Sequence, residues 1–239
     1  MMEQASQSGI ILKSKYAGGA ARALPYLKNT GISEQLPSAG VSEFPRKQTL
    51  FFEGDSADAI FEICTGTVEL YKTFLSGRRG VLGFFRAGAI VGFAMDADYP
   101  YSAEAVTPCQ VRRISRASLD RVLGRSPSFA KRLLEATCRE LTVTQEKMFI
   151  LSRKSPAGKV AWFLLQHKRP PACAATGMPV VEMPMSRADI ADYLGMAPET
   201  LCRTLTKFKR DGLILADTPY RVRLRNIAKL TRLAEEACN

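Results

Sequence analysis

An acidic and a basic side chain lie four residues apart in the second half of the chain, at Glu199 and Arg203. In a helix this spacing places both side chains on one face, about 40° apart around the axis. An arginine can donate to O6 and N7 of guanine, and a glutamate can accept from N4 of cytosine. The pair could therefore read base edges. The alternative is a surface ion pair that stabilises the helix by only about 0.3–0.5 kcal/mol.

The helix that carries this pair has an apolar and a polar face when its residues are placed at 100° intervals. Leu201, Leu205 and Phe208 fall on one side and are expected to be buried. The polar side is suited to DNA, and we assign base reading to Glu199, Arg203 and Cys202. Contacts to DNA phosphates, which position a domain without reading sequence, are assigned to Ser186, Arg187, Thr200, Lys207 and Arg221.

The residues before this helix have the pattern of a second, shorter helix and a turn. Ser186 and Asp189 form the S-x-x-D signature of a capping box, and Gly195 is expected to end the first helix. Pro198 begins the next helix, although Ala197 before it has no side chain that could cap the end. Two short helices joined in this way form a helix-turn-helix, which can place its second helix in a major groove.

The chain carries its positive charge beside this motif. Its net charge is +11, of which residues 1–120 contribute +1 and residues 121–239 contribute +10. A localised excess of this kind attracts nucleic acid or an anionic membrane surface, unless it is only a solvated face. After a turn at 217–219, arginines alternate with apolar residues over 220–225, which predicts a hairpin with one basic face beside the helices. Together these features favour nucleic acid.

The first half of the chain has a different pattern. Between residues 41 and 116 short apolar runs alternate with glycines, which is typical of an antiparallel barrel or roll. A long helix then begins at Ser126-Pro127, and one of its faces repeats every third and fourth residue. That face can pack against its copy in a second subunit, although burial against its own domain is the alternative. The face consists of Ala130, Leu134, Thr137, Leu141, Thr144, Met148 and Leu151.

The expected fold class is therefore α+β, with an N-terminal antiparallel β-roll, a long dimerisation helix and a C-terminal winged helix-turn-helix. The corresponding segments are a partly ordered tail at 1–30, the β-roll at 31–120, the dimerisation helix at 121–152 and the DNA-binding domain at 153–239.

Other functional classes lack the residues they need. The only histidine, His167, cannot by itself form a histidine-rich metal site, and nothing around it indicates a serine–histidine–aspartate arrangement. We therefore interpret His167 as a structural or surface residue and expect no catalytic site, no metal site and no enzyme activity. The six cysteines form no C-x-x-C pair and are expected to be reduced and mostly buried. No apolar run reaches the length of a membrane span and no secretory signal is evident, so we expect a cytoplasmic protein without membrane contact.

The order of β-roll, long helix and winged helix-turn-helix over residues 41–225 resembles the CRP/FNR superfamily of transcription regulators. The motifs that carry the resemblance are FFEGD at 51–55, FEICTGTVELY at 61–71, the turns at Gly77 and Gly88, DYLG at 192–195 and ETLCR at 199–203. The E-x-x-x-R spacing is most similar to the FNR/FixK branch. That resemblance implies a homodimer that binds a palindrome of TTGAT-like half-sites on double-stranded DNA, activates transcription and contacts RNA polymerase.

The chain departs from the ligand-binding members of that superfamily. Ala89 and Tyr101-Ser102 stand where cyclic-nucleotide-binding relatives have a glutamate and an arginine–serine pair, so the resemblance implies no binding of cAMP. The first cysteine is Cys64, so the N-terminal cysteine group of the iron–sulfur members is missing. We therefore expect no cofactor and a FixK-like control of low-oxygen genes. An effector in the β-roll, or redox control through Cys202, stays open as an alternative.

Overall fold

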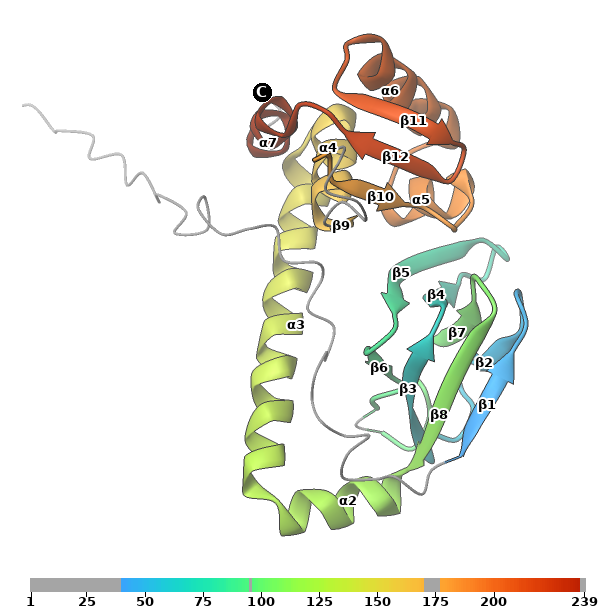
Figure 1. Ribbon diagram of the computed structural model, residues 1–239. Helices are drawn as coiled ribbons and strands as arrows, with labels where there is room; N and C mark the ends of the chain where they lie inside the picture. The colour runs from blue at the N-terminus through green and yellow to red at the C-terminus, as the bar shows by residue number, and fades with distance from the viewer. Residues whose placement is uncertain (1–39, 95, 170–176, 237–239) are drawn as a thin grey trace, which may run out of the picture.

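The computed structural model describes residues 40–94, 96–169 and 177–236. The tail expected at residues 1–30 lies outside this part of the chain. Figure 1 shows a β-roll and a C-terminal domain placed one above the other, with a long helix running beside both. This is the order of elements that the sequence predicts, and the α+β fold class is confirmed.

Over residues 40–94 and 96–115, the β-roll forms two four-stranded sheets in which all paired strands are antiparallel. The first sheet has the order β1 (Val41–Phe44), β8 (Cys109–Ser115), β3 (Ala59–Thr65) and β6 (Ile90–Val91). The second sheet has the order β2 (Thr49–Phe51), β7 (Ser102–Ala105), β4 (Thr67–Thr73) and β5 (Arg79–Arg86).

The core of the roll follows from the apolar runs between the glycines. Ile63 and Val68 are fully buried, and the rings of Phe51 and Tyr99 stack with their centroids 4.0 Å apart. Gly66 joins β3 to β4 with a φ of 89°, and a Cβ atom there would lie 2.4 Å from the carbonyl oxygen of Pro108. Only glycine fits this turn without a backbone shift.

Two helices follow the roll. α2 (Arg116–Arg125) turns the chain away from β8, and α3 (Pro127–Arg153) runs along the molecule (Figure 1). Ser126 caps α3 through its side chain, which accepts from the amide of Phe129 at 3.3 Å, and Pro127 occupies the first turn. The predicted start of the long helix is therefore confirmed, whereas residues 121–125 belong to α2.

In the part of the C-terminal domain that the structure describes, there are a four-stranded sheet and four helices. The sheet has the order β11 (Ile214–Thr218), β12 (Arg221–Leu224), β10 (Val180–Glu182) and β9 (Lys168–Arg169). The helices are α4 (Pro156–Gln166), α5 (Arg187–Tyr193), α6 (Pro198–Arg210) and α7 (Ile227–Glu235).

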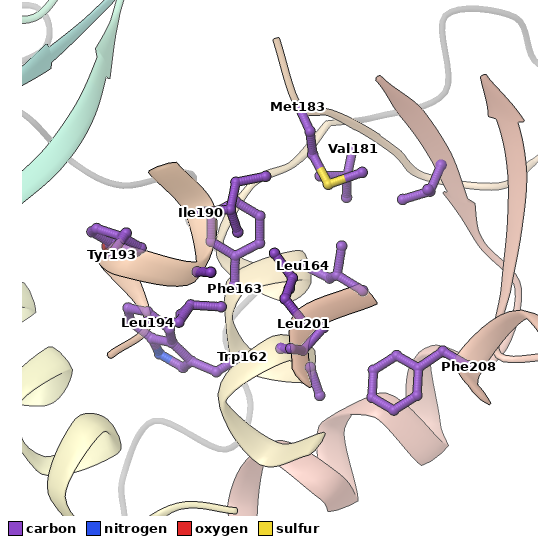
Figure 2. Packing of buried hydrophobic residues seen from close by; sticks show 14 of the residues in the cluster. Trp162, Phe163, Leu164, Val181, Met183, Ile190, Tyr193, Leu194, Leu201 and Phe208 are labelled. Atoms are coloured by element: carbon purple, nitrogen blue, oxygen red, sulfur yellow. The ribbon is translucent and has the colours of Figure 1, made fainter. Parts of the chain in front are cut away.

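The helices of this domain pack around one apolar core, shown in Figure 2. Trp162 and Phe163 of α4, Ile190 of α5 and Leu201 and Phe208 of α6 are all buried in it. Tightly packed side chains of this kind hold helices in fixed relative positions. The core therefore fixes the angle between α5 and α6.

The structure also locates the cysteines and the histidine. Of the four cysteines it describes, only Cys109 is buried, Cys64 is half-buried, and Cys138 and Cys202 are exposed, so the expectation of mostly buried thiols is wrong for these residues. Cys138 and Cys202 lie on the solvent-exposed faces of their helices. The number of cysteines carries no information on which helix face each one occupies, whereas helix periodicity does. His167 is buried, and burial lowers its pKa to about 3, so it stays neutral.

Within the described part of the chain, no helix has both the length and the apolar character needed to cross a membrane.

Candidate nucleic-acid interface

The first helix of the candidate interface, α5, is fixed at its N-terminus by the predicted capping box. The amide of Asp189 donates to Oγ of Ser186 at 3.1 Å, and the amide of Ser186 donates to Oδ2 of Asp189 at 3.0 Å. Gly195 follows the helix with a φ of 58°, a conformation that favours glycine. The helix–turn geometry that the sequence predicts is confirmed.

The second helix, α6, begins at Pro198, and Ala197 makes no side-chain capping bond, as predicted. Leu201 and Phe208 are almost fully buried, and Leu205 is half-buried. The predicted apolar stripe therefore anchors α6 to the domain core, and the opposite face of the helix remains exposed.

That exposed face carries the three predicted base-reading residues, Glu199, Cys202 and Arg203. The guanidinium of Arg203 donates to Oγ1 of Thr200 at 3.4 Å, and among the described residues it forms no ion pair with Glu199. The alternative interpretation of Glu199 and Arg203, a surface ion pair between them, is therefore not what the structure shows. Both charged groups keep their hydrogen-bonding capacity for an external partner.

A shallow hollow of about 290 Å³ lies along the same face. Three basic side chains and two small polar groups line it, which suits a polyanion that lies against a helix. Thr206 and Arg210 are not among the DNA-contacting residues predicted from the sequence, although on the helix they lie at angles close to that of Arg203. The lining consists of Cys202, Arg203, Thr206, Lys207 and Arg210.

The predicted phosphate-contacting residues differ in how exposed they are and in which segments they contact. Ser186 and Lys207 are exposed and Thr200 is half-buried, next to Arg203. Arg187 is half-buried, and its Nη2 donates to the carbonyl oxygen of Pro219 at 2.5 Å. Arg187 therefore already connects α5 to the turn of the β11–β12 hairpin.

Arg221 lies on the side of the hairpin that faces the β-roll. It lines a cleft of about 560 Å³ together with Cys64 and Arg86 of the roll, and its Nε is 4.0 Å from Oδ2 of Asp217. The structure thus brings Arg221 together with the other domain rather than with the residues of the α6 hollow.

A contact that the sequence analysis does not identify holds the candidate interface against the β-roll. The amide of Val81 in β5 donates to Oδ2 of Asp192 in α5 at 2.6 Å. Lys147 of α3 donates to the carbonyl oxygen of Leu82 at 2.8 Å, and its ammonium group lies 3.7 Å from the centroid of the Tyr193 ring. These bonds connect the roll, the long helix and the helix-turn-helix at one point.

Comparisons with known proteins agree with this geometry. A Crp-like helix-turn-helix domain matches residues 158–233, and a cyclic nucleotide-binding domain matches residues 41–126. The chain is 34% identical to the nitrogen fixation regulation protein FixK of Bradyrhizobium diazoefficiens over 197 residues, which cover 79% of this chain and 83% of FixK. The chain belongs to the CRP/FNR family of transcription regulators.

Further CRP/FNR relatives are similar in sequence and in structure. The transcriptional activatory protein AadR of Rhodopseudomonas palustris is 33% identical, with 79% of this chain and 83% of AadR covered. The structure of FixK2 from Bradyrhizobium japonicum superposes with a TM-score of 0.76 at 30% identity, covering 84% of this chain and 99% of FixK2. The protein is thus a FixK-like, DNA-binding CRP/FNR regulator, and its relatives are transcription regulators rather than enzymes.

Proposed function

We propose that this CRP/FNR protein works as a homodimer, binds a palindrome of TTGAT-like half-sites, and activates low-oxygen genes in the manner of FixK by contacting RNA polymerase. The observation that carries the proposal is the exposed face of α6, where Glu199 and Arg203 are not paired with each other. Arg203 would donate to a guanine and Glu199 would accept from a cytosine. Cys202 borders the same face.

The exposed side of α3 supports the homodimer. Leu134, Leu141 and Met148 of the predicted seam are 64%, 58% and 68% exposed, although they are apolar and lie in line along the helix. Thr137 and Thr144 between them are also exposed. An apolar stripe of this length on a helix is typical of a surface that packs against a second helix. A two-fold axis along α3 would also explain a palindromic site.

The test of the proposed function is a titration of the purified protein against labelled DNA without any added effector. A duplex with two TTGAT-like half-sites in palindromic order should bind with a dissociation constant of about 10⁻⁸ M or lower at physiological salt. A duplex with the same composition in scrambled order should bind at least about a thousandfold more weakly. Equal affinity for both duplexes would refute sequence-specific reading.

Lys207 should act differently from the base-reading residues, because an ammonium group in this position neutralises a phosphate. Lys207→Ala is expected to weaken binding to the palindrome and to scrambled DNA by the same factor. The slope of log K against log salt should decrease in magnitude by about one for each recognition helix. Anisotropy titrations between 50 and 200 mM salt measure both effects. A loss confined to the palindrome would instead assign Lys207 to base reading.

A second candidate function is regulation by a small molecule bound in the β-roll. The observation that favours it is a cavity of about 510 Å³ between the roll and α3. Its lining includes Tyr101, which stands where the resemblance implies an arginine in cyclic-nucleotide-binding relatives. If purified protein without effector binds the palindrome only weakly, this second candidate is favoured over the effector-independent one.

Redox control through Cys202 is a further variant of the proposed DNA-binding function. Oxidation of this exposed thiol by peroxide would add bulk and an acidic group beside the DNA-reading face. We expect treatment with peroxide to weaken DNA binding by about fivefold or more, about 1 kcal/mol, in the parent protein. Cys202→Ser should bind normally and should not respond to peroxide. Cys138→Ser, which removes the other exposed thiol among the described residues, is the control and should respond like the parent.

A further inference from the structure

Two buried carboxyl groups lie on the face of the β-roll that packs against α5 (Figure 1). Glu69 of β4 and Glu104 of β7 are opposite each other in the sheet, and their side chains are only 2% and 6% exposed. Glu69 is also opposite Phe84 of β5, whose ring centroid lies 5.4 Å from that of Tyr193 in α5. Because residues opposite each other in a sheet project to the same face, both carboxyl groups are on the side of the C-terminal domain.

The positive and negative charges around these carboxyl groups are unequal in number when all of them are ionised. Nη1 of Arg79 is 2.9 Å from Oε2 of Glu104 and 3.6 Å from Oε1 of Glu69. Nζ of Lys47 is 3.1 Å from Oε1 of Glu104, as an ion pair rather than an aligned hydrogen bond. A third carboxylate, that of Asp189 in α5, adds to the negative charge at Glu69. Three carboxylates and two cations leave one negative charge, which a single proton can neutralise.

The carboxyl group of Glu69 receives little compensation from these cations. Its Oε2 is buried and has no hydrogen-bond partner among the described residues. Burial raises the pKa of Glu69 to about 7. Asp189 and Glu104 raise this pKa too, and Lys47 and Arg79 offset part of the shift. An ionised carboxylate that is cut off from water and from donors is strongly destabilising, whereas burial of the protonated form is much less unfavourable.

We propose that Glu69 is a proton-sensitive contact between the β-roll and the C-terminal domain, which forms while Glu69 carries a proton and weakens when Glu69 is ionised. Separation of α5 from the roll would admit water to the carboxyl group and take Asp189 away from it. Protonation therefore favours the arrangement in which the amide of Val81 donates to Asp192. The inference goes beyond the proposed function, because it depends neither on the palindrome nor on the effector of the second candidate.

The pKa of Glu69 sets the direction of the pH dependence. This pKa is about 7 with the contact formed, and it returns towards the ordinary value of 4.5 when the carboxyl group is hydrated. Formation of the contact thus takes up a proton at a pH between these two values. Its equilibrium constant should fall by up to about tenfold per pH unit as the pH rises towards 7, and should level off above that, where Glu69 is ionised in both arrangements.

Two other groups near this interface have shifted pKa values and have to be told apart from Glu69. Lys147 of α3 contacts α5, and burial lowers its pKa to about 8, so that it is largely charged below pH 7. Burial also raises the pKa of Glu140 in α3 to about 7, but this residue lines the cavity between α3 and the roll. Tyr71 of β4 lies beside the cluster, with its ring centroid 4.2 Å from the guanidinium carbon of Arg79.

The test measures hydrogen exchange of the Val81 amide by NMR in the full-length protein between about pH 5.5 and 8, because this amide donates to Asp192 across the interface. After correction for intrinsic exchange, its protection should fall by up to about tenfold per pH unit up to about pH 7 and then stay constant. Glu69→Gln, which resembles the uncharged carboxyl group, should keep the amide protected without this slope. Glu140→Gln is the matched control and should keep the parent's slope.

The infrared absorption of protonated carboxyl groups provides a second readout, which does not require the contact to open. Subtracting the spectrum of Glu69→Gln from that of the parent isolates the band of Glu69. The band should be present at about pH 6 and should disappear with a midpoint of about 7. A carboxylate that is ionised throughout and has only a structural role would give no such band.

Protection of Val81 that is independent of pH below 7 would overturn the inference, as would an equal slope in Glu69→Gln or the loss of the slope in Glu140→Gln. The absence of a Glu69 band at about pH 6 would overturn it as well. None of these experiments contains DNA, so their failure leaves the proposed function unaffected. Failure to bind the palindrome would refute the proposed function even if Val81 and Glu69 behaved as expected.

Discussion

Replacing Arg203 by alanine is expected to weaken binding to the TTGAT-like palindrome by about 1–3 kcal/mol at each half-site, or about 5- to 150-fold per subunit. The reason is the position of the side chain on the exposed face of α6, where its guanidinium has only a 3.4 Å contact to Thr200. Loss of the bidentate contact also removes discrimination at one base pair. The variant should accept all four bases there with similar affinity.

The measurement is a set of competition titrations with duplexes that differ at one base pair in both half-sites. Lys207→Ala is the matched control, because it removes a positive charge from the same hollow. The control should lose affinity but keep the order of preference among the duplexes. If Arg203→Ala instead keeps the parent's preference at every position, Arg203 is a phosphate contact and the proposed reading scheme is wrong.

Leu141→Glu is expected to convert the protein to a monomer and to reduce affinity for the palindrome by about 10²–10⁴-fold. Leu141 is 58% exposed in the single chain, so the substitution does not disturb the fold of the subunit. In a symmetric dimer two glutamates would face each other in an apolar seam, where unpaired charges are strongly unfavourable. A monomer can occupy only one half-site at a time and loses the advantage of simultaneous binding.

Sedimentation velocity measures the oligomeric state, and anisotropy with full and half sites measures the affinities. Thr142→Glu serves as the control, since Thr142 is also exposed but lies about 100° further around the helix. The control should remain dimeric. If Leu141→Glu forms dimers as tightly as the control does, the stripe on α3 is not the dimer surface.

The sequence predicts those parts of the structure that depend on neighbouring residues. The capping box at Ser186 and Asp189, the helix start at Pro127 and the buried stripe of α6 are all local patterns, and the structure confirms them. Each follows from helix periodicity or from backbone groups within one turn of the capping residue.

Contacts between distant segments could not be predicted in this way. Val81 and Asp192 are 111 residues apart in sequence, and nothing in the local pattern of either indicates the bond between them. The same holds for Glu140, which becomes a cavity wall only because the β-roll folds back beside α3. The prediction of mostly buried thiols is wrong for Cys138 and Cys202 because it rests on composition alone, which does not specify the position of a residue.

The bond between Val81 and Asp192 has a consequence for the target genes. The bond ties α5 to the β-roll, and the shared apolar core holds α6 against α5. In the proposed dimer we therefore expect the separation between the two copies of α6 to be set mainly by the protein. One base pair inserted at the centre of the operator shifts a half-site by about 3.4 Å and rotates it by about 35°. Promoters under this regulator's control should therefore tolerate changes in the bases of the spacer far better than changes in its length.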